Sequence, residues 1–514
     1  METCVSTDRL QRILSVGVAL TAERDFSRLL DTILSEAMSI TGCDAGTLYL
    51  LEDGKLHFKI MRNHTLGVFP GSGNAPAELP SFDLCESNVA SYVVIHRRME
   101  NIADVYDLEK FDFTGPRHYD TLTGYRTKSM LVIPLINNRD EIVGVLQLIN
   151  ALDSDGRIIA FSPDYEDVFR SISSLAAVAI TNMRYNEENR LLFQSLIEVL
   201  AAAIDERSSY NANHTRNVAE LTKGFIDFLN RQHSDGNTHI HFTAEMSQQI
   251  VTAAWLHDVG KIITPLEIMD KSTRLGEKAP IINLRFETIL ALERVRFLEK
   301  ITTETEYEKI VSEINEAREL CAKANSGAPA SDDELALIRS YGLRACPKPG
   351  GEALRWLEPD EIESLVILSG TLTSAERRIM EEHVEITSRL LEKIRFSNEY
   401  RYVPDYAADH HEKLNGRGYP SGKADKELPA GTRILSVVDV FEALTARDRP
   451  YKKAIPYEKA FDILDEMADK GELDAELVGL LRKWKRETGD EEKTFCRSHD
   501  CSLDGASDKR AGLR

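Results

Sequence analysis

The sequence predicts an α+β domain built on an antiparallel sheet, followed by a domain made of helices. Three observations lead to this fold class. Short apolar segments separated by polar turns occupy residues 45–150, a stretch without Gly or Pro runs from residue 164 to about 203, and the pattern after residue 195 is helix and loop throughout. A chain of 514 residues has room for two to four domains of roughly 150 residues each.

The front domain is expected to contain one amphipathic helix and four strands. Apolar side chains recur with helical spacing from about residue 26 to residue 38. Polar turns join the strands in pairs, which is typical of antiparallel hairpins. The strands are expected at 45–51, 55–61, 129–136 and 142–150. The segment 67–83 is rich in Gly and Pro and predicts a loop.

A long helix is expected to begin at Ser162-Pro163-Asp164, where Pro stands at the first helical position and acidic residues fill the first turn. Its apolar residues step by three and four along two stretches: Val168, Ile172, Leu175 and Ala179, then Phe193, Leu196, Leu200 and Ile204. This spacing favours a parallel dimer contact that passes a signal between domains. The alternative is a surface helix packed only on its own domain.

The expected domain boundaries follow from these patterns. Residues 486–514 lose periodicity and are rich in charge, Ser and Gly, so they are expected to be disordered. The complete division is 1–25 as an N-terminal helix, 26–182 as the front domain, 183–205 as a helical connector, 206–485 as the rear domain and 486–514 as the tail.

Composition excludes several classes of protein. The chain carries 63 Lys and Arg against 84 Asp and Glu, a net charge of −21, which repels phosphate backbones and argues against nucleic-acid binding. Seven scattered cysteines favour a reducing compartment over a disulfide framework. No apolar run approaches the ~20 residues that cross a bilayer. We therefore expect a cytoplasmic protein, and interpret residues 13–22 as an amphipathic helix rather than a signal peptide.

Five of the 13 histidines suggest a metal site. The doublet His257-Asp258 ends an apolar segment, and the doublet His410-His411 precedes a Gly-rich loop. Taken singly, a histidine such as His214 or His383 is more often a surface or capping residue. Two doublets flanked by apolar segments favour a buried metal site, because burial of polar pairs is costly without a metal or partner.

From about residue 196 to residue 483 the chain resembles an HD-GYP domain, a subclass of the HD metal-dependent phosphohydrolases. The resemblance is carried by His214, His257-Asp258-Val259-Gly260-Lys261, His383, His410-His411, Gly418-Tyr419-Pro420, Asp439-Val440-Phe441-Glu442-Ala443-Leu444-Thr445 and Asp448-Arg449-Pro450-Tyr451-Lys452. It implies a bacterial second-messenger phosphodiesterase that opens cyclic di-GMP to linear pGpG. Whether hydrolysis continues to GMP is left open.

The resemblance also implies roles for individual residues. The implied ligands of two divalent ions, iron or manganese, are His214, His257, Asp258, His383, His410, His411 and Asp439, with Asp258 bridging. Asp258 and Lys261 form the implied catalytic pair, and Lys261 offsets phosphate charge. Arg449 and Lys452 are implied to hold the second phosphate or the charge that develops during the reaction. Tyr419 is expected to stack on the nucleotide or to form a hydrogen bond with it, or else to pack within its loop.

The chain departs from the family pattern in three ways. Tyr210 stands where some relatives carry a Glu that supports a third metal, so two metals are expected. One extra residue lies between Asp439 and Arg449. An insertion at about 276–369, expected to be helical from 282 to 324 and again near 332–341 and 359–365, separates His257 from His383. It is interpreted as a lid, a dimer contact, a regulator of substrate access or a surface excrescence.

Residues 26–182 resemble a GAF domain, a small-molecule sensing or dimerising module. The segment Val143–Asn150 and Phe161-Ser162 carry the likeness. Members that bind cyclic nucleotides tend to have Asn-Lys where this chain has Asn150-Ala151, which puts that ligand in doubt.

Together these patterns predict a signalling enzyme in which a GAF sensor controls a cyclic di-GMP phosphodiesterase. The expected partners are cyclic di-GMP, an unidentified small molecule at the GAF domain, and a second copy of the chain through the connector. One alternative is an HD phosphohydrolase that acts on another cyclic dinucleotide or nucleotide. The other is a non-catalytic cyclic-dinucleotide-binding protein, but the presence of all seven ligands argues for catalysis.

Overall fold

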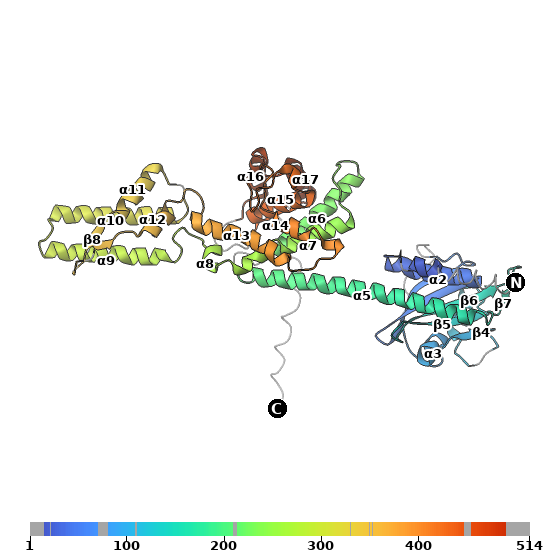
Figure 1. The fold of residues 1–514 in the computed structure, drawn as a ribbon. Helices are drawn as coiled ribbons and strands as arrows, with labels where there is room; N and C mark the ends of the chain where they lie inside the picture. The colour runs from blue at the N-terminus through green and yellow to red at the C-terminus, as the bar shows by residue number, and fades with distance from the viewer. Residues whose placement is uncertain are drawn as a thin grey trace, which may run out of the picture. The chain divides into compact units, whose positions relative to one another are not determined.

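The structure is a computed structural model that describes residues 15–20, 22–69, 81–107, 110–208, 213–328, 330–348, 350–351, 353–446 and 454–489. It divides into two compact units, Met1–Leu192 and Phe193–Arg514, and each is described by itself (Figure 1). Across the described ranges, no helix has both the length and the apolar character needed to span a membrane.

The front unit is built on one antiparallel sheet. Its strands are β1 (Cys43–Glu52), β2 (Lys55–Asn63), β3 (Phe82–Asp83), β4 (Glu100–Ile102), β5 (Met130–Ile136), β6 (Ile142–Leu152) and β7 (Ile158–Ile159). Their order is β3-β2-β1-β6-β5-β4, and β7 pairs with β6. The four strands expected from the sequence are confirmed, each a few residues from the expected bounds. The pairing of β1 with β6 brings the two expected hairpins together at the centre of the sheet.

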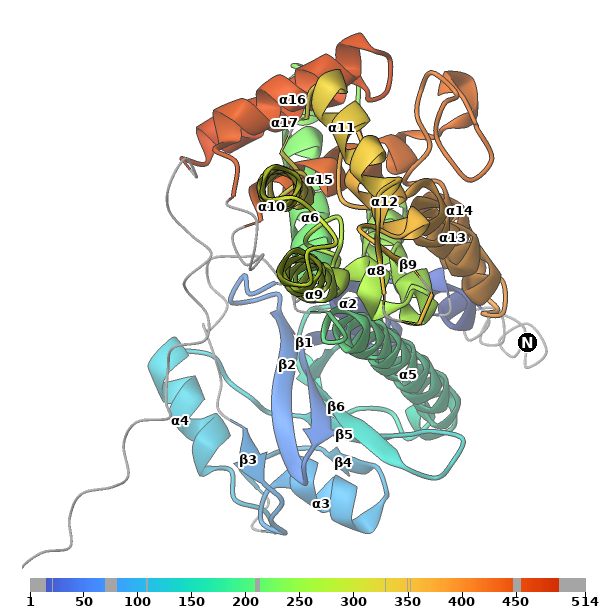
Figure 2. The same cartoon turned by 90° about the vertical axis from the view of Figure 1, so that its left-hand side faces the viewer.

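Helices cover both faces of this sheet (Figure 2). Helix α2 (Phe26–Thr41) packs on one face, where Leu34, Leu48 and Phe169 share a buried cluster. Gly46 lies beneath α2, and a Cβ there would stand 2.7 Å from Leu34, so a side chain would push the helix away. Helix α3 (Val89–His96) belongs to a second buried cluster, together with side chains of β5 and β6. Helix α4 (Thr114–Thr123) follows it in the chain. Of the expected N-terminal helix, residues 15–20 are helical and the part before residue 15 lies outside the described residues.

Helix α5 (Tyr165–Asp205) is continuous, as the absence of Gly and Pro predicts. Phe193 is partly buried against the core of the rear unit, where its ring lies 5.1 Å from that of Tyr400, and Ile204 is buried. The exposed apolar residues of this part of the helix include Leu192, Leu196, Val199 and Leu200. Two of the expected dimer positions, Leu196 and Leu200, are therefore exposed, whereas Phe193 and Ile204 are packed or buried within the chain.

The rear unit is a helical bundle. Its elements are α6 (His214–Ser234), α7 (Ala244–Leu256), the 3-10 turn η1 (Val259–Ile263), α8 (Leu266–Met269), α13 (Ser374–Leu391), η2 (Asn398–Tyr400), α14 (Val403–Ala408), η3 (Asp425–Glu427), α15 (Ala430–Thr445), α16 (Tyr457–Asp469) and α17 (Ala475–Glu487). One core joins them, with Phe225, Phe441, Phe461 and Trp484 among its members. Side-chain caps begin three of these helices: Thr243 accepts from the Met246 amide at α7, Thr373 forms a capping box with Glu376 at α13, and Asp474 accepts from the Leu477 amide at α17.

The insertion has its own core, which includes Phe286, Ile314 and Trp356. It consists of α9 (Lys278–Leu298), α10 (Glu304–Asn325), α11 (Asp332–Gly342), the hairpin β8 (Ala345–Pro347) with β9 (Ala353–Arg355), and α12 (Pro359–Leu365). Two expectations were wrong here. The expected helix over 282–324 is broken at residues 299–303, where Thr303 caps α10, and the two short strands contradict a rear half of helix and loop alone.

The insertion leaves and rejoins the bundle at one place. The Thr371 hydroxyl donates to the Lys271 carbonyl at 2.9 Å. The buried Arg274 guanidinium donates to the carbonyls of Leu365 and Gly370 at 3.2 and 3.3 Å. The bundle can therefore close beneath the insertion without a long connection.

Candidate metal centre

Five segments of the rear unit bring the expected ligands together. His214 is the first residue of α6, His257-Asp258 follow α7, His383 lies within α13, His410-His411 follow α14, and Asp439 lies within α15. All are buried except His411, which is half-buried. Helix ends and helix faces from distant parts of the chain thus converge on one interior position.

The first group of ligand atoms surrounds Asp258 and Asp439. The Nε2 atom of His214 lies 3.2 Å from Asp439 Oδ1 and 3.5 Å from Asp258 Oδ2. The Nε2 atom of His257 lies 3.2 Å from Asp258 Oδ2 and 3.6 Å from Asp439 Oδ1. Ligand atoms of His214, His257 and Asp258 lie within 4.8 Å of one another.

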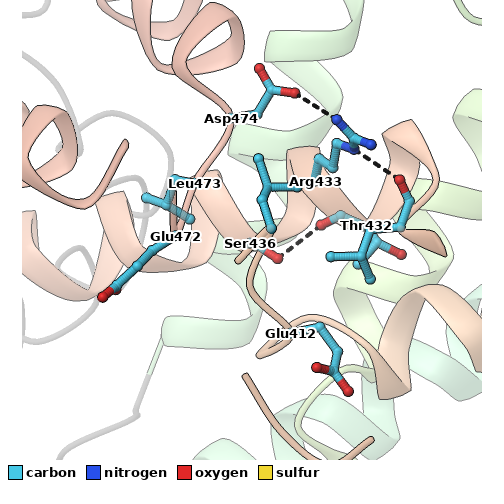
Figure 3. Close-up of a pocket in the computed structure, with 9 residues that line it drawn as sticks. Glu412, Thr432, Arg433, Ser436, Glu472, Leu473 and Asp474 are labelled. Atoms are coloured by element: carbon cyan, nitrogen blue, oxygen red, sulfur yellow. Dashed lines mark hydrogen bonds and ion pairs between the residues drawn. The ribbon is translucent and has the colours of Figure 1, made fainter. Parts of the chain in front are cut away.

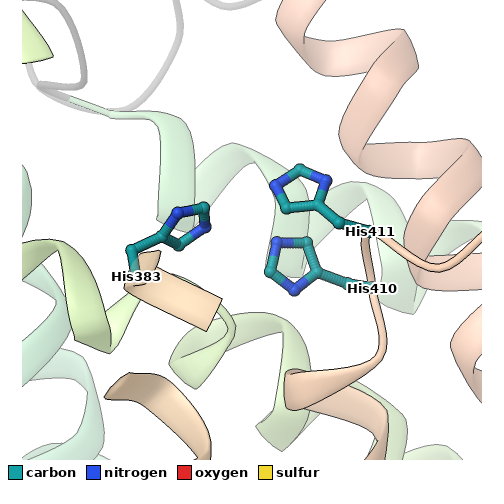
Figure 4. Close-up of side chains that lie close together, drawn as sticks. All are labelled: His383, His410 and His411. Atoms are coloured by element: carbon teal, nitrogen blue, oxygen red, sulfur yellow. The ribbon is translucent and has the colours of Figure 1, made fainter. Parts of the chain in front are cut away.

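The second group consists of His383, His410 and His411, whose rings face one another (Figure 4). Their ligand atoms also lie within 4.8 Å of one another. Asp258 connects the two groups, because its Oδ1 lies 3.3 Å from His383 Nε2 while its Oδ2 faces the first group. This position between two clusters is the one that a bridging carboxylate occupies.

Backbone carbonyls orient three of the imidazoles. The Nδ1 atoms of His257, His383 and His410 contact the carbonyls three residues earlier, at 2.7, 2.5 and 2.7 Å. Since a carbonyl only accepts, Nδ1 carries a proton, and Nε2 is the nitrogen left to bind a metal. Within the described residues, all three Nε2 atoms and Asp258 Oδ1 are buried without a hydrogen-bond partner. Such orphaned atoms are costly unless something binds them, so this donor set fits metal ions.

The electrostatics of the site separate its ligands into two kinds. Burial lowers the pKa of His411 to about 4 and holds that of His410 well below its usual value, so both imidazoles are neutral. Burial opposes ionisation of Asp258, but His257 and Lys261 outweigh it and hold its pKa well below the usual value. Burial opposes protonation of His257 and His214, but the neighbouring carboxylates outweigh it, raising the pKa of His257 to about 9 and that of His214 well above its usual value. Neutral imidazoles and ionised carboxylates are the forms that bind metal, so a bound metal ion would displace these protons.

Glu442 is a member of this site to which the sequence reasoning assigned no role. Its Oε2 lies 2.5 Å from His214 Nδ1, and its Oε1 accepts a hydrogen bond of 2.9 Å from Asn217. Glu442 therefore orients His214 through the nitrogen that does not face the carboxylates. Its spacing of three residues from Asp439 on α15 was the available sign, since both then lie on one helix face.

The remaining expected residues are only partly described. Lys261 Nζ lies 2.6 Å from Asp258 Oδ2, so this cation is at the centre. The Tyr419 ring lies 4.9 Å from that of His411 and is held by a bond from its amide to the His411 carbonyl. Tyr210, Arg449 and Lys452 lie outside the described residues, as does the expected tail beyond residue 489.

A small pocket borders the centre without containing any of its ligands (Figure 3). It is lined by Glu412, Leu414, Leu428, Thr432, Arg433, Ser436, Glu472, Leu473 and Asp474. Ser436 donates to the His410 carbonyl at 2.7 Å, so the pocket adjoins the backbone that carries this ligand.

Comparisons with known proteins identify both halves of the chain. Residues 25–180 match the GAF domain family, and residues 356–477 match the HD domain family. The chain is therefore a protein with a GAF domain and an HD domain. The HD match includes His383, His410, His411 and Asp439, whereas His214 and the His257-Asp258 doublet precede it and reach the site through the fold.

Phosphodiesterases are among the curated relatives that match. A 3'3'-cGAMP-specific phosphodiesterase 3 of Vibrio cholerae is 37% identical over 114 residues, which is 22% of this chain and 24% of that protein. A cyclic di-GMP phosphodiesterase of Thermotoga maritima is 36% identical over 112 residues, 22% of this chain and 29% of that protein. The chain thus spans less than a third of the length of either relative.

Solved GAF domains are among the structures that match the chain, at low similarity. The GAF domain from an Acinetobacter phosphoenolpyruvate-protein phosphotransferase is 15% identical, covering 35% of this chain and 97% of that chain with a TM-score of 0.27.

Proposed function

We propose that the chain is a metal-dependent phosphodiesterase that opens cyclic di-GMP to linear pGpG. The observation that carries this proposal is the convergence of five histidines and two aspartates around Asp258, with several inward-facing ligand atoms buried and unsatisfied. The names of the relatives support a cyclic dinucleotide as the substrate class.

Two divalent ions would be held by His214, His257, Asp258 and Asp439 on one side and by His383, His410 and His411 on the other, with Asp258 shared. Bound there, such ions supply an activated water and charge compensation for a phosphodiester. A ligand set of imidazoles and carboxylates suits iron or manganese.

The chain's own residues orient the ligands and the substrate. Glu442 and the backbone carbonyls fix the imidazole tautomers, and burial keeps bulk water from the ligand atoms. Lys261, 2.6 Å from Asp258, brings a positive charge to where a phosphate would approach. Tyr419 presents a ring beside His411 for contact with a base. Arg449 and Lys452 are proposed to hold the second phosphate.

A second candidate substrate is 3'3'-cGAMP. It is supported by the Vibrio cholerae relatives, three of which are named as specific for this dinucleotide. It shares the two phosphodiester bonds that the metal centre would recognise, so the two substrates differ at a base. A protein that binds such a dinucleotide without hydrolysing it is the alternative outside enzyme function.

The front domain is proposed to sense an unidentified small molecule and to act on the HD domain through α5. The exposed stripe of Leu192, Leu196 and Val199 on this helix supports a parallel homodimer contact. The four cysteines of the described residues, Cys43, Cys85, Cys321 and Cys346, are unpaired, which supports a reducing compartment such as the cytoplasm.

The test is hydrolysis by purified chain loaded with manganese or iron. Cyclic di-GMP, 3'3'-cGAMP and cyclic AMP are supplied separately, and chromatography resolves linear dinucleotide from mononucleotide. We expect metal-dependent turnover of cyclic di-GMP, loss of turnover and of bound metal in Asp258→Ala, and neither loss in Asp360→Ala, which changes an exposed carboxylate. If the metal-loaded chain binds the dinucleotide but does not hydrolyse it, the proposed phosphodiesterase activity is wrong.

A further inference from the structure

Helix α9 of the insertion has two apolar faces. One face, which includes Ile282, Phe286 and Ile289, is buried in the core of the insertion. The other face carries large apolar side chains in solvent: Ile281, Leu284, Val295 and Leu298 are 57%, 68%, 48% and 67% exposed. Figure 1 shows α9 as one outer helix of the insertion, with α10 along one side. A surface helix normally turns polar residues outward, so this second face needs an explanation.

The exposed residues follow a heptad pattern. Ile281, Leu284, Thr288, Ala291, Val295 and Leu298 alternate in steps of three and four, and all six are exposed. This spacing is the one that two helices use to pack side by side along a shared stripe. We call these six residues the α9 stripe.

The α9 stripe is complementary to itself when two copies run antiparallel. In that register Ile281 faces Leu298 of a second copy, Leu284 faces Val295, and the small pair Thr288 and Ala291 meet at the two-fold axis. Every layer is repeated by the symmetry, as a self-complementary contact requires. Small residues at the crossing allow the helices to approach closely.

Charges beside the stripe favour the same arrangement. Glu287 and Arg294 flank the α9 stripe on one side. In the antiparallel pair, Glu287 of each copy faces Arg294 of the other copy. Glu287 is more than half exposed although it also contacts Arg318 of its own chain at 2.8 Å. In a parallel pairing, Glu287 would instead face an apolar residue, Leu292.

We propose that the α9 stripe is a docking surface for α9 of a second copy of this chain, paired antiparallel. The insertion is then a self-association module that is separate from the exposed stripe on α5. The contact is short, about five helical turns, so it adds to association rather than supplying all of it.

Cross-linking of the full chain tests both the contact and its direction. Chains carrying Ile281→Cys and chains carrying Leu298→Cys are co-expressed, treated with a short bismaleimide, and digested for mass spectrometry. We expect a linked peptide that joins positions 281 and 298, and no 281–281 link when Ile281→Cys is expressed alone. Peptide identification separates these products from links through native cysteines.

Matched variants show whether the α9 stripe itself makes the contact. Adding Leu284→Glu and Val295→Glu to both chains should reduce the 281–298 product at least tenfold. Adding Leu343→Glu and Leu368→Glu, which alter side chains 90% and 79% exposed outside α9, should leave it unchanged. Circular dichroism checks that each variant keeps its helices. Absence of the 281–298 product from folded chain overturns the proposal and makes a different protein the candidate occupant. A 281–281 product also overturns it, because it shows that the two copies pair in parallel.

Discussion

Gly260 lies against the backbone of His383, where a Cβ would stand only 1.9 Å from the His383 carbonyl oxygen. The Gly260 amide donates to the Thr387 hydroxyl at 3.0 Å, and this hydroxyl donates to the His257 carbonyl at 3.1 Å. The turn that carries the His257-Asp258 doublet is thus fastened to the helix that carries His383. The two proposed halves of the metal centre are held in register by a contact that only glycine permits.

Gly260→Ala should therefore disrupt the metal centre by displacing the backbone that carries its residues. The added methyl forces η1 and α13 apart, and overpacking of this kind costs about 1–3 kcal/mol. We expect a lower free energy of unfolding and a lower bound-metal content by elemental analysis. Gly479→Ala is the control, because a Cβ there meets nothing within 4 Å and lies within helix α17. That change should stabilise the chain by about 0.5–1 kcal/mol. Equal metal content in the two variants would show that the spacing of η1 and α13 does not matter.

Glu442→Gln tests the positioning of His214. The amide keeps the shape of the side chain but removes the charge that lies 2.5 Å from His214 Nδ1. Changes to such supporting groups weaken metal affinity about 10- to 100-fold. We expect that loss in a manganese titration by calorimetry, with the fold unchanged. Glu472→Gln, which alters a carboxylate paired with Lys413, should bind manganese as the native chain does. Unchanged affinity in Glu442→Gln would leave Glu442 as a packing residue only.

Removal of the insertion tests whether it takes part in catalysis. The bond between Thr371 and Lys271 and the contacts of Arg274 bring its two ends together, so a short Gly-Ser linker can replace residues 276–369. We expect the shortened chain to fold, to unfold cooperatively and to hydrolyse the same dinucleotide with KM within about threefold of the native value. A large rise in KM with unchanged kcat would favour a lid that contacts substrate. Failure to fold would show that the separate core of the insertion supports the bundle.

The two doublets could be predicted from the sequence because each is a short local motif, whereas His214, His383 and Asp439 were expected as ligands only from the family resemblance. The His257-Asp258 and His410-His411 doublets follow apolar segments, and a buried helix end can aim such a doublet inward. The strands of the front sheet were equally accessible, since their alternation and turns are local features. In both cases the pattern lies within about ten residues.

The contacts that hold the site together could not be predicted from local sequence patterns. Gly260 and Thr387 are 127 residues apart, and no local pattern relates a glycine to a hydroxyl on another helix. The hairpin of β8 and β9 has strands of three residues, too short to show alternation. The break between α9 and α10 contains neither Gly nor Pro, and only the capping pair Thr303 and Glu306 marks it. Tertiary packing decides these features.

The pair of Lys271 and Glu376 joins the base of the insertion to the helix of His383, and it should make stability depend on pH. Both Glu376 oxygens lie 2.7 Å from Lys271 Nζ. Partial burial opposes ionisation of Glu376, but Lys271 outweighs it and lowers the pKa below the usual 4.5. Because the folded-state pKa is depressed, the stabilisation is complete above pH 4.5 and is lost as the pH falls through the folded-state value.

Glu376→Gln removes the charge of Glu376 but keeps its role in the helix cap, since glutamine can still complete the capping box with Thr373. Urea unfolding at pH 7 should show a loss of about 1 kcal/mol or less, the scale of partly exposed ion pairs. The difference between the variant and the native chain should narrow as the pH is lowered below 4.5. Glu466→Gln is the control, because its partner Lys470 lies on an exposed helix face and the change should have little effect at any pH. A difference for Glu376→Gln that stays constant from pH 7 to the acid limit would assign the effect to the cap and not to the ion pair.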